Sequence, residues 1–469
     1  MNKVVNRVDK LMYIALLALV AFVPYSAVLI EAALLVMMIG WQVKHFLIWK
    51  NNPRQGVWNS YKLPFYQLQW PMIALGLLIL LTLPLSHAPA LTLKKFFSRF
   101  LQQVLLVYLV VELVNTPKRL YQLMAILLGT LAVVNADVVA QYFSGHSFIY
   151  VKHTMLFQRV SGPMRHPNDL GTLLVMSLPI ILSLIIIRRS WMSALFKSKI
   201  AVVITILSWV LFLCSMVSLG LTSSRGAWLA FALTMTGWSL YLRNRKIIAG
   251  VILVLIIFFT FFGIRCMNTR FDISPEVVVN SEVVVSSQAT VNSKISANSE
   301  VTNNFAIKSA YNSGKIFFNP SRRGEYWQTA GKIIQRYPFF GCGYNTYIQT
   351  LQQFNLFPQE YPHNSILHIM AEMGIIGLLI YLWFWALLFI SGAKILKSIF
   401  LNSDLYILGV GVYFSLLAWL IHSFTDTAWE SLQLSIFWWF LVGILFSLPS
   451  VFQQLNLRPA ECGLSKERS

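Results

Sequence analysis

The side chain best placed for acid–base chemistry is a histidine just before a long apolar run. His363 stands in YPHNSILHIMAEMGIIGLL, residues 361–379. Histidine is the side chain most suited to taking up a proton near neutral pH. On a helical wheel that advances about 100° per residue, Gly374 and Gly377 fall on the face of His363. Because small residues let a neighbouring segment approach closely, we expect a glycine seam with His363 at its outer mouth.

A second histidine lies deeper in the same run. His368 and Glu372 are four residues apart, on another face of the expected helix. Side chains at this spacing are neighbours on a helix surface. Ionisable residues at membrane depth are functional candidates, but a buried pair with a structural role is the simpler expectation here.

Arginines form the next candidate group, because several stand where a cation is unfavourable unless it binds an anion. Arg225 follows Ser223 and Ser224, either of which can cap the next helix, and Arg322 and Arg323 open a later amphipathic stretch. The helix dipole disfavours a cation in the first turn. A bound anion would satisfy both the guanidinium groups and the exposed N–H groups. The alternative is that these arginines reach lipid headgroups.

Two further arginines flank a Gly-Pro turn. Arg159 and Arg165 lie in QRVSGPMRHPNDLG, directly before an apolar run that begins at Asp169. Both are secondary candidates for the same anion. His166 in this stretch could be a ligand or a base, but a turn residue is the simpler interpretation.

The composition determines what must position these side chains. The chain has 469 residues, of which 57% are hydrophobic and only 12% are charged, whereas soluble domains carry about 25% charged residues. The long apolar runs of the sequence are each long enough to cross a hydrocarbon layer of about 30 Å. We therefore expect an all-α polytopic membrane protein with about twelve transmembrane helices and one large loop. The expected spans are 11–23, 26–48, 67–85, 100–115, 120–143, 169–187, 200–222, 226–242, 247–264, 364–391, 405–424 and 433–449.

Charge predicts the orientation of these spans. The net charge is +20, and the linkers on one side are almost uniformly basic. The positive-inside rule makes that side, with both termini, cytoplasmic. The candidate arginines fall on the opposite side, where positive charge is not expected. The positive-inside rule therefore does not explain these arginines, whereas an anion bound on the outward side would.

The spans divide the chain into four segments. Residues 1–264 hold helices one to nine, 265–363 form a large periplasmic loop, 364–449 hold helices ten to twelve, and 450–469 form a cytoplasmic tail. Within the loop, 274–315 is a low-complexity insert rich in Ser, Val and Asn, and 321–345 predicts an amphipathic helix followed by a turn. Cys266 and Cys342 in this loop could form a disulfide or remain thiols.

Several chemistries lack their sequence signature. The sequence has no Asp-x-Asp, no Cys/His metal spacing, no GxxxxGK[ST] and no GxSxG. This disfavours metal-dependent transfer and nucleotide-driven transport. We expect no metal site, no cofactor and no nucleic-acid partner.

Taken together, the motifs resemble those of the O-antigen ligase/polymerase family of bacterial inner-membrane glycosyltransferases. The matching elements are HNSILHIMAEMGIIG (363–377), SSRGAW (223–228), RVSGPMRHPNDLG (159–171), Arg323 with Trp327, and YPFFGCGYNTY (337–347). The resemblance covers about 159–377, and the insert at 274–315 departs from the pattern.

The resemblance implies a fold similar to the GT-C-type membrane glycosyltransferases and a periplasmic active site. It implies transfer of a polysaccharide from undecaprenyl diphosphate to a sugar hydroxyl of lipid A–core, without metal and with inversion. His363 would be the general base, and Arg225 and Arg323 would bind the diphosphate, with Arg159, Arg165 and Arg322 as second choices. A polymerase of the same family, a protein O-oligosaccharyltransferase and a lipid-linked sugar transporter are the alternatives.

Overall fold

The computed structural model describes residues 2–51, 67–150, 155, 159–187, 198–271, 322–400 and 403–464. These residues form helices, and no β-strand is found among them. The helices are α1 (Asn2–Phe22), α2 (Ala27–Asn51), α4 (Gln69–Leu81), η2 (Leu83–Leu85), α5 (Pro89–Lys95), η3 (Phe96–Leu101), α6 (Gln102–Leu113), α7 (Pro117–Ser144), α8 (Pro167–Ile186), α10 (Ser198–Leu221), α11 (Arg225–Tyr241), α12 (Arg245–Phe271), α15 (Arg322–Arg336), α16 (Tyr347–Gln353), α17 (Ser365–Ser398), α18 (Ser403–Ser423), η5 (Ala428–Glu430) and α19 (Leu432–Leu464).

Each of the twelve predicted apolar stretches coincides with a helix. Eight helices of the described chain are long and apolar enough to cross a membrane: Ala27–Asn51, Pro89–Leu113, Pro117–Ser144, Pro167–Ile186, Arg245–Gly263, Ser365–Ser398, Asp404–Ser423 and Leu432–Leu455. The fold is thus all-α and of membrane type, as predicted, and the twelve-span count stays a prediction.

The core of the bundle is built around α8 and α19, whose residues are mostly buried. α8 packs against α10, α11 and α18, and α19 packs against α6, α17 and α18. α2 and α12 are mostly exposed along their apolar lengths, which suits helices that face lipid. The buried helices therefore fix the positions of their own ends, where the candidate residues lie.

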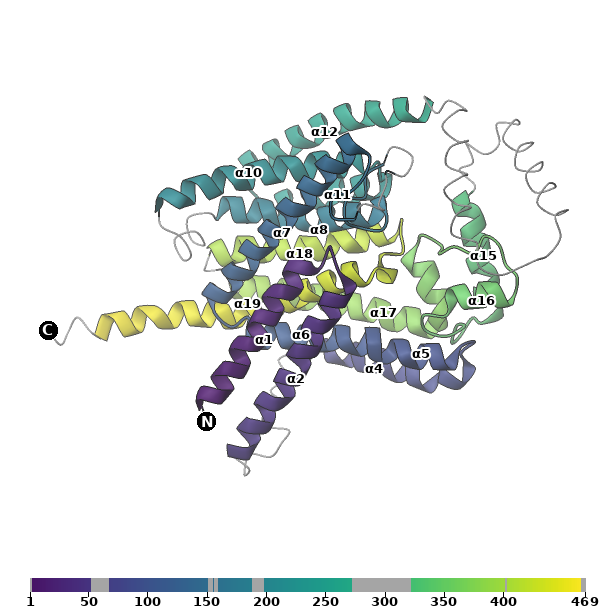
Figure 1. Ribbon diagram of the computed structural model, residues 1–469, viewed down its shortest axis with the longest axis horizontal. Coiled ribbons are helices and arrows are strands. Elements are labelled where there is room, and N and C mark those ends of the chain that lie inside the picture. Colours follow the sequence, from purple (N-terminus) through teal and green to yellow (C-terminus); the bar gives the residue numbers. More distant parts are fainter. Residues whose placement is uncertain are drawn as a thin grey trace.

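The helix termini that carry the candidate residues lie together at one end of the molecule. α15 and α16 lie together there, next to the beginnings of α17 and α5, whereas both chain termini lie toward the opposite end (Figure 1). α15 occupies the stretch where the sequence predicts an amphipathic helix. Its apolar side, with Ala330 and Ile333, packs against Cys342, Tyr347 and Ala371. The apolar face of α15 is thus buried against protein.

α17 is not a continuous helix. Gly374 interrupts it with φ 63° and ψ −167°, a conformation open essentially only to glycine. The helical wheel that put Gly374 and Gly377 on the face of His363 is therefore wrong beyond Met373. His363 itself precedes the helix, with φ 45°.

At Gly374 the glycine seam receives the backbone of residues 338–343, whereas Gly377 faces Leu78 of the neighbouring helix α4. Cys342 N and Gly343 N donate to the carbonyls of Ala371 and Glu372, at 3.0 and 2.9 Å. Below the break, Ile375 N donates to the carbonyl of Pro338 at 2.8 Å. The loop thus satisfies groups that the broken helix leaves open, as buried backbone groups require. Residues 371–376, where α17 is interrupted, and the loop segment 338–343 that binds to them are together called the joint below.

Candidate active site

His363 forms a pair with an aspartate 63 residues further along the chain. Its Nδ1 atom lies 2.9 Å from Oδ1 of Asp426, between α18 and α19. The side chain of His363 is 29% exposed and that of Asp426 11% exposed, so the imidazole faces outward over a buried carboxylate. A carboxylate that accepts from Nδ1–H leaves Nε2 as the basic nitrogen. This is the arrangement expected of an oriented general base.

The segment around His363 is fixed by the turn after α18. Asn364 caps α17, because its side-chain oxygen accepts from Ile366 N at 3.0 Å and from Leu367 N at 3.1 Å. Its amide donates to the carbonyl of Phe424, and Ser365 Oγ donates to that of Asp426. The sequence His-Asn-Ser therefore builds both the helix cap and the contact that holds the histidine beside its partner.

Asp426 was not among the residues that the sequence singled out as candidates. Burial alone would raise the pKa of its carboxyl group. The hydrogen bond from His363, the nearby His422 and the N–H of Thr427 outweigh burial and hold that pKa well below its usual range. Asp426 is thus an anion at all working pH values, and it stabilises a positive charge on His363.

α15 brings an arginine next to the pair. Trp327 Nε1 donates to the carbonyl of Pro362 at 3.0 Å, and the Tyr326 ring lies 5.6 Å from the His363 ring. Arg323 precedes Tyr326 by three residues and Trp327 by four, so it lies on the same face of the helix. It also lies within electrostatic range of His422. The backbone of Arg322 opens α15, and its side chain lies outside the described residues.

Arg225 opens α11 on the other side of the same turn. A side chain on the next residue, Gly226, would meet Thr425 Oγ1 at 2.2 Å, so the start of α11 lies directly against the Thr425 side chain. Thr425 directly precedes Asp426. Ser224 occupies the N-cap position, but its side chain makes no capping hydrogen bond. The exposed Arg225 therefore stands at a helix start that has N–H groups to offer to an anion.

Arg159 and Arg165 occupy different roles. Arg159 donates from Nε to the carbonyl of Thr222 at 2.7 Å and from Nη2 to Asn168 Oδ1 at 2.8 Å, so it ties the end of α10 to the start of α8. Arg165 is exposed. His166 caps α8 by accepting from Asn168 N at 3.2 Å, in agreement with its interpretation as a turn residue. Burial, and then the guanidinium of Arg159, lower the pKa of His166.

These contacts bring the beginnings of α8, α11, α15 and α17 to one place. α11 packs on α8 where Ala227 Cβ approaches Gly171, and His166, His363 and Asp426 are within electrostatic range of one another. Each helix start carries partial positive charge. The candidate site is thus a cationic surface around one imidazole, although its residues come from separate parts of the chain.

Cys342 is a free, buried thiol of the joint. Burial, and then the carboxylate of Glu372, raise its pKa to about 12. The side chain of Cys266 lies outside the described residues. The structure therefore does not contain the disulfide that the sequence left open. The described residues also contain no cluster of three or more metal-ligating side chains.

The fold and the site describe a helical membrane protein with a histidine–aspartate pair beside a surface that carries arginines. Residues 209–382 match the family described as O-antigen ligase. The match includes Arg225, Arg323, His363 and the joint. Over these residues the chain is similar to that family, and the match supports the O-antigen ligase/polymerase family. No curated protein matches the chain.

Members of this family are glycosyltransferase-like ligases and polymerases, and the match supports this general type of activity with lipid-linked polysaccharide substrates in a membrane setting. Many apolar helices and this family fit a multi-pass protein of the bacterial inner membrane. The donor, the acceptor and the roles of the individual residues remain to be argued.

Proposed function

We propose that the protein is an O-antigen ligase that transfers polysaccharide from undecaprenyl diphosphate to a sugar hydroxyl of lipid A–core. The observation that supports this most directly is the His363–Asp426 pair, at 2.9 Å, beside the arginine-bearing starts of α11 and α15. An acceptor hydroxyl needs a base, and a diphosphate leaving group needs cations. The site offers both within one small region.

In the proposed reaction, Nε2 of His363 removes the proton from the acceptor hydroxyl. The oxygen attacks the anomeric carbon of the donor sugar, the bond from that carbon to the diphosphate oxygen breaks, and undecaprenyl diphosphate leaves. Asp426 offsets the charge of the imidazolium. Direct displacement of this kind inverts the anomeric configuration.

Arg225 and Arg323 bind the diphosphate and offset the charge that grows on it as the bond breaks. Preorganised groups of this kind contribute about 3 kcal/mol each to the stability of a transition state. Arg165 and Arg322 are second contributors to the same anion site. Arg159 holds the ends of α8 and α10 in place beside it, because its Nε and Nη2 bind Thr222 and Asn168.

The proposal includes a topology of twelve spans, with both termini cytoplasmic and the site in the periplasm. The separation of α15 and α16 from both termini supports it (Figure 1). Substrates are then delivered to the outer surface of the membrane, where the arginines counter the usual charge bias.

Deletion of the gene tests the function. A ligase defect removes all O-antigen from lipopolysaccharide on a gel and leaves lipid-linked polymer. Core that carries a single repeat would instead identify the polymerase, and an unchanged pattern would leave a transporter or a protein ligase. Complementation with His363→Ala should fail, whereas His146→Ala, which changes an exposed histidine outside the site, should restore the pattern.

A chelator provides the second test, on purified protein with lipid-linked donor. Transfer that continues in excess chelator supports a reaction driven by His363 and the arginines. Loss of transfer on chelation, and its recovery on adding a divalent ion, would contradict this part of the proposal.

A further inference from the structure

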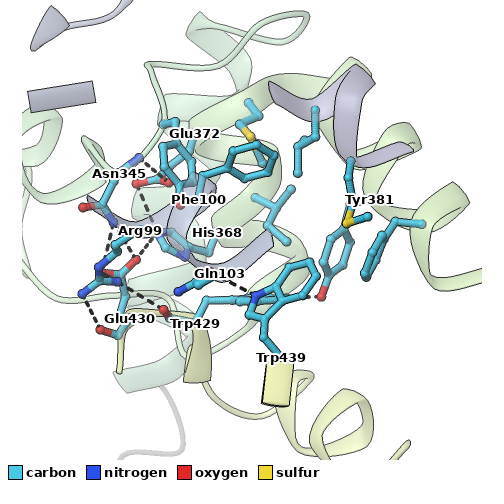
Figure 2. A pocket seen from close by; sticks show the side chains of 16 residues that line it. Arg99, Phe100, Gln103, Asn345, His368, Glu372, Tyr381, Trp429, Glu430 and Trp439 are labelled. Atoms are coloured by element: carbon cyan, nitrogen blue, oxygen red, sulfur yellow. Dashed lines mark hydrogen bonds and ion pairs between the residues drawn. The ribbon is translucent and has the colours of Figure 1, made fainter. Parts of the chain in front are cut away.

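A second polar cluster lies on the other side of the segment that carries Asp426. Glu430, four residues after Asp426, accepts from Asn345 Nδ2 at 3.2 Å and from Tyr361 Oη at 3.1 Å. Arg99 Nη1 lies 3.6 Å from Glu430 Oε2, and Arg99 Nη2 donates to the Glu430 carbonyl at 2.9 Å. This Arg99–Glu430 pair stands at one side of a pocket whose opposite side is apolar (Figure 2).

The inner wall of the polar side consists of His368 and Glu372. Their side chains are only 4% and 6% exposed, against 16% and 19% for Arg99 and Glu430. Exposure thus falls from the Arg99–Glu430 pair toward His368. This gradient makes the ion pair the outer edge of the pocket and the histidine its interior.

One buried atom in this wall lacks a hydrogen bond. His368 Nε2 lies 3.3 Å from Glu372 Oε1 and 3.7 Å from Glu430 Oε1, but neither contact has hydrogen-bond geometry, and no described group supplies another partner. Both Glu372 oxygens already accept backbone N–H groups, from Asn345 at 2.8 Å and Tyr347 at 3.0 Å. A buried polar atom without a partner is costly and calls for a ligand or water.

The rest of the pocket is hydrocarbon. Phe100, Met373, Phe384 and Trp439 line it together with Met72 and Leu75 of α4, and its volume is about 80 Å³. Tyr381 and Trp439 lie across the pocket from Arg99 and Glu372 (Figure 2). The pocket therefore holds one small polar end and the adjoining part of a hydrocarbon chain, because its volume is too small for a saccharide chain or for a whole lipid.

The charges select the polar end. Two carboxylates face one guanidinium, so an anionic group is repelled, and Arg99 is already bound to Glu430 and to two carbonyls. A hydroxyl can donate to a carboxylate oxygen and accept from an imidazole N–H at once. A hydroxyl can therefore bridge His368 Nε2 and Glu430 Oε1, which lie 3.7 Å apart, whereas an ammonium can only donate.

We propose that this pocket is a separate binding site for a neutral, hydroxylated amphiphile, with the hydroxyl between His368 and Glu430 and the hydrocarbon along Phe100, Phe384 and Trp439. The site does not depend on the proposed transfer reaction. The hydroxyl comes from a glycerol-type headgroup or from the edge of a sugar headgroup, and the experiment distinguishes the two.

Native mass spectrometry of the full chain, held in an amine-oxide detergent that has no hydroxyl group, tests the proposal. The probes share a ten-carbon chain: 1-decanoylglycerol and decyl glucoside as hydroxylated amphiphiles, decylamine as the cation and decanoate as the anion. One equivalent of a hydroxylated probe should bind more tightly than decylamine or decanoate. Whichever of the two hydroxylated probes binds tighter identifies the headgroup.

Two variants act on opposite ends of the pocket. His368→Phe keeps the aromatic contacts with Tyr347 and Tyr361 but removes the nitrogen. Leu75→Trp fills the apolar end from α4. Each should weaken the hydroxylated probe about tenfold, the effect of one buried hydrogen bond or of lost space. Glu325→Gln, at an exposed position on α15, should leave binding unchanged.

Equal binding to wild type and to both variants would overturn the proposal, as would tighter binding of decanoate or decylamine. Melting temperatures are measured alongside. If His368→Phe proves unstable, Leu75→Trp decides the outcome alone, because it leaves every polar contact in place.

Discussion

Two polar regions lie on either side of residues 424–431, and they are built on opposite principles. Around His363, Arg225 and Arg323 are exposed, and among the described residues Arg323 forms no ion pair with a carboxylate. Around Glu430, Arg99 is bound to a carboxylate and two carbonyls, and Glu372 accepts two N–H groups. The first region exposes its arginines at the surface, and the second uses its arginine in internal contacts.

The difference explains why both regions can exist so close together. A buried charge must be paired, whereas an exposed arginine at a helix start costs little and attracts an anion. The second region also holds the joint, because Glu372 binds the loop that leads back to α15. The internal network thus positions the external one, and the two should respond differently to equivalent substitutions.

The largest difference is expected for the histidines. His363→Ala should lower the transfer rate by about a thousandfold, within the range for loss of a general base. Because the imidazole also donates to the buried carboxylate of Asp426, the melting temperature should fall modestly as well. Purified variants are compared by the rate of polymer transfer and by thermal unfolding. Normal transfer in His363→Ala would contradict the proposed base.

The joint should be the most sensitive point for stability. A methyl group at Gly374 would lie 2.2 Å from the Phe339 backbone, in a conformation that costs other residues several kcal/mol. Gly374→Ala should therefore destabilise the protein by about 3 kcal/mol or more. The matched control is Gly129→Ala in α7, where nothing lies within 4 Å of the added carbon. Gly129→Ala should be neutral or stabilising, because alanine favours the helix.

Equal melting temperatures for the two glycine variants would show that the interruption of α17 does not hold the loop. Loss of activity in Gly374→Ala without loss of stability would instead mean that the joint aligns α15 with His363. Either result sharpens the distinction between the two regions.

Matched arginine substitutions compare the regions directly. Arg323→Ala should lower transfer about a hundredfold, the effect of losing one preorganised charge, and leave stability unchanged. Arg99→Ala should destabilise the protein by about 1–3 kcal/mol, because it leaves two carbonyls without their donor and removes the positive charge beside Glu430. Transfer rates and urea unfolding are measured for both. The comparison fails if Arg323→Ala unfolds the protein as readily as Arg99→Ala does.

Much of the fold followed from the apolar runs, because a membrane allows few alternatives to a helix. The fourth run shows the limit. The fourth apolar run was predicted to begin at residue 100, because Lys94, Lys95 and Arg99 interrupt the hydrophobic pattern before it. The structure continues the helix back to Pro89, through a π-helical turn at Phe96–Leu101. Arg99 is tolerated there only because Glu430, 331 residues away, supplies acceptors.

The candidate site was predicted less completely. His363 and the arginines stood out because their types were unexpected at helix starts. Asp426 did not, because its partner is 63 residues away and no local spacing links them. The break at Gly374 was also missed, because the wheel assumed a continuous helix. The signal was present in PFFGCG at 338–343, which supplies the backbone that replaces the missing helical contacts.

The smallest effect separates the role of Asp426 from that of its partner. Asp426→Asn keeps the shape of the side chain but removes the charge behind the imidazole. Transfer should fall only about tenfold, because Asn364, Ser365 and the Tyr326 ring still hold the segment. The folded-state pKa of Asp426 is depressed, so its ionised form stabilises the fold above the ordinary pKa of an aspartate. That contribution is lost as the pH falls through the depressed value, where the carboxylate becomes protonated.

The melting temperatures of wild type and Asp426→Asn should therefore differ most near neutral pH and converge in acid. Glu430→Gln provides the comparison from the other region. Glu430→Gln also removes a charge, and it should lower the melting temperature. Its transfer rate should fall only as far as the smaller folded fraction accounts for. A constant difference between wild type and Asp426→Asn from neutral to acidic pH would mean that the charge of Asp426 does not stabilise the fold. Its contact with His363 would then orient the ring without supporting a positive charge on it.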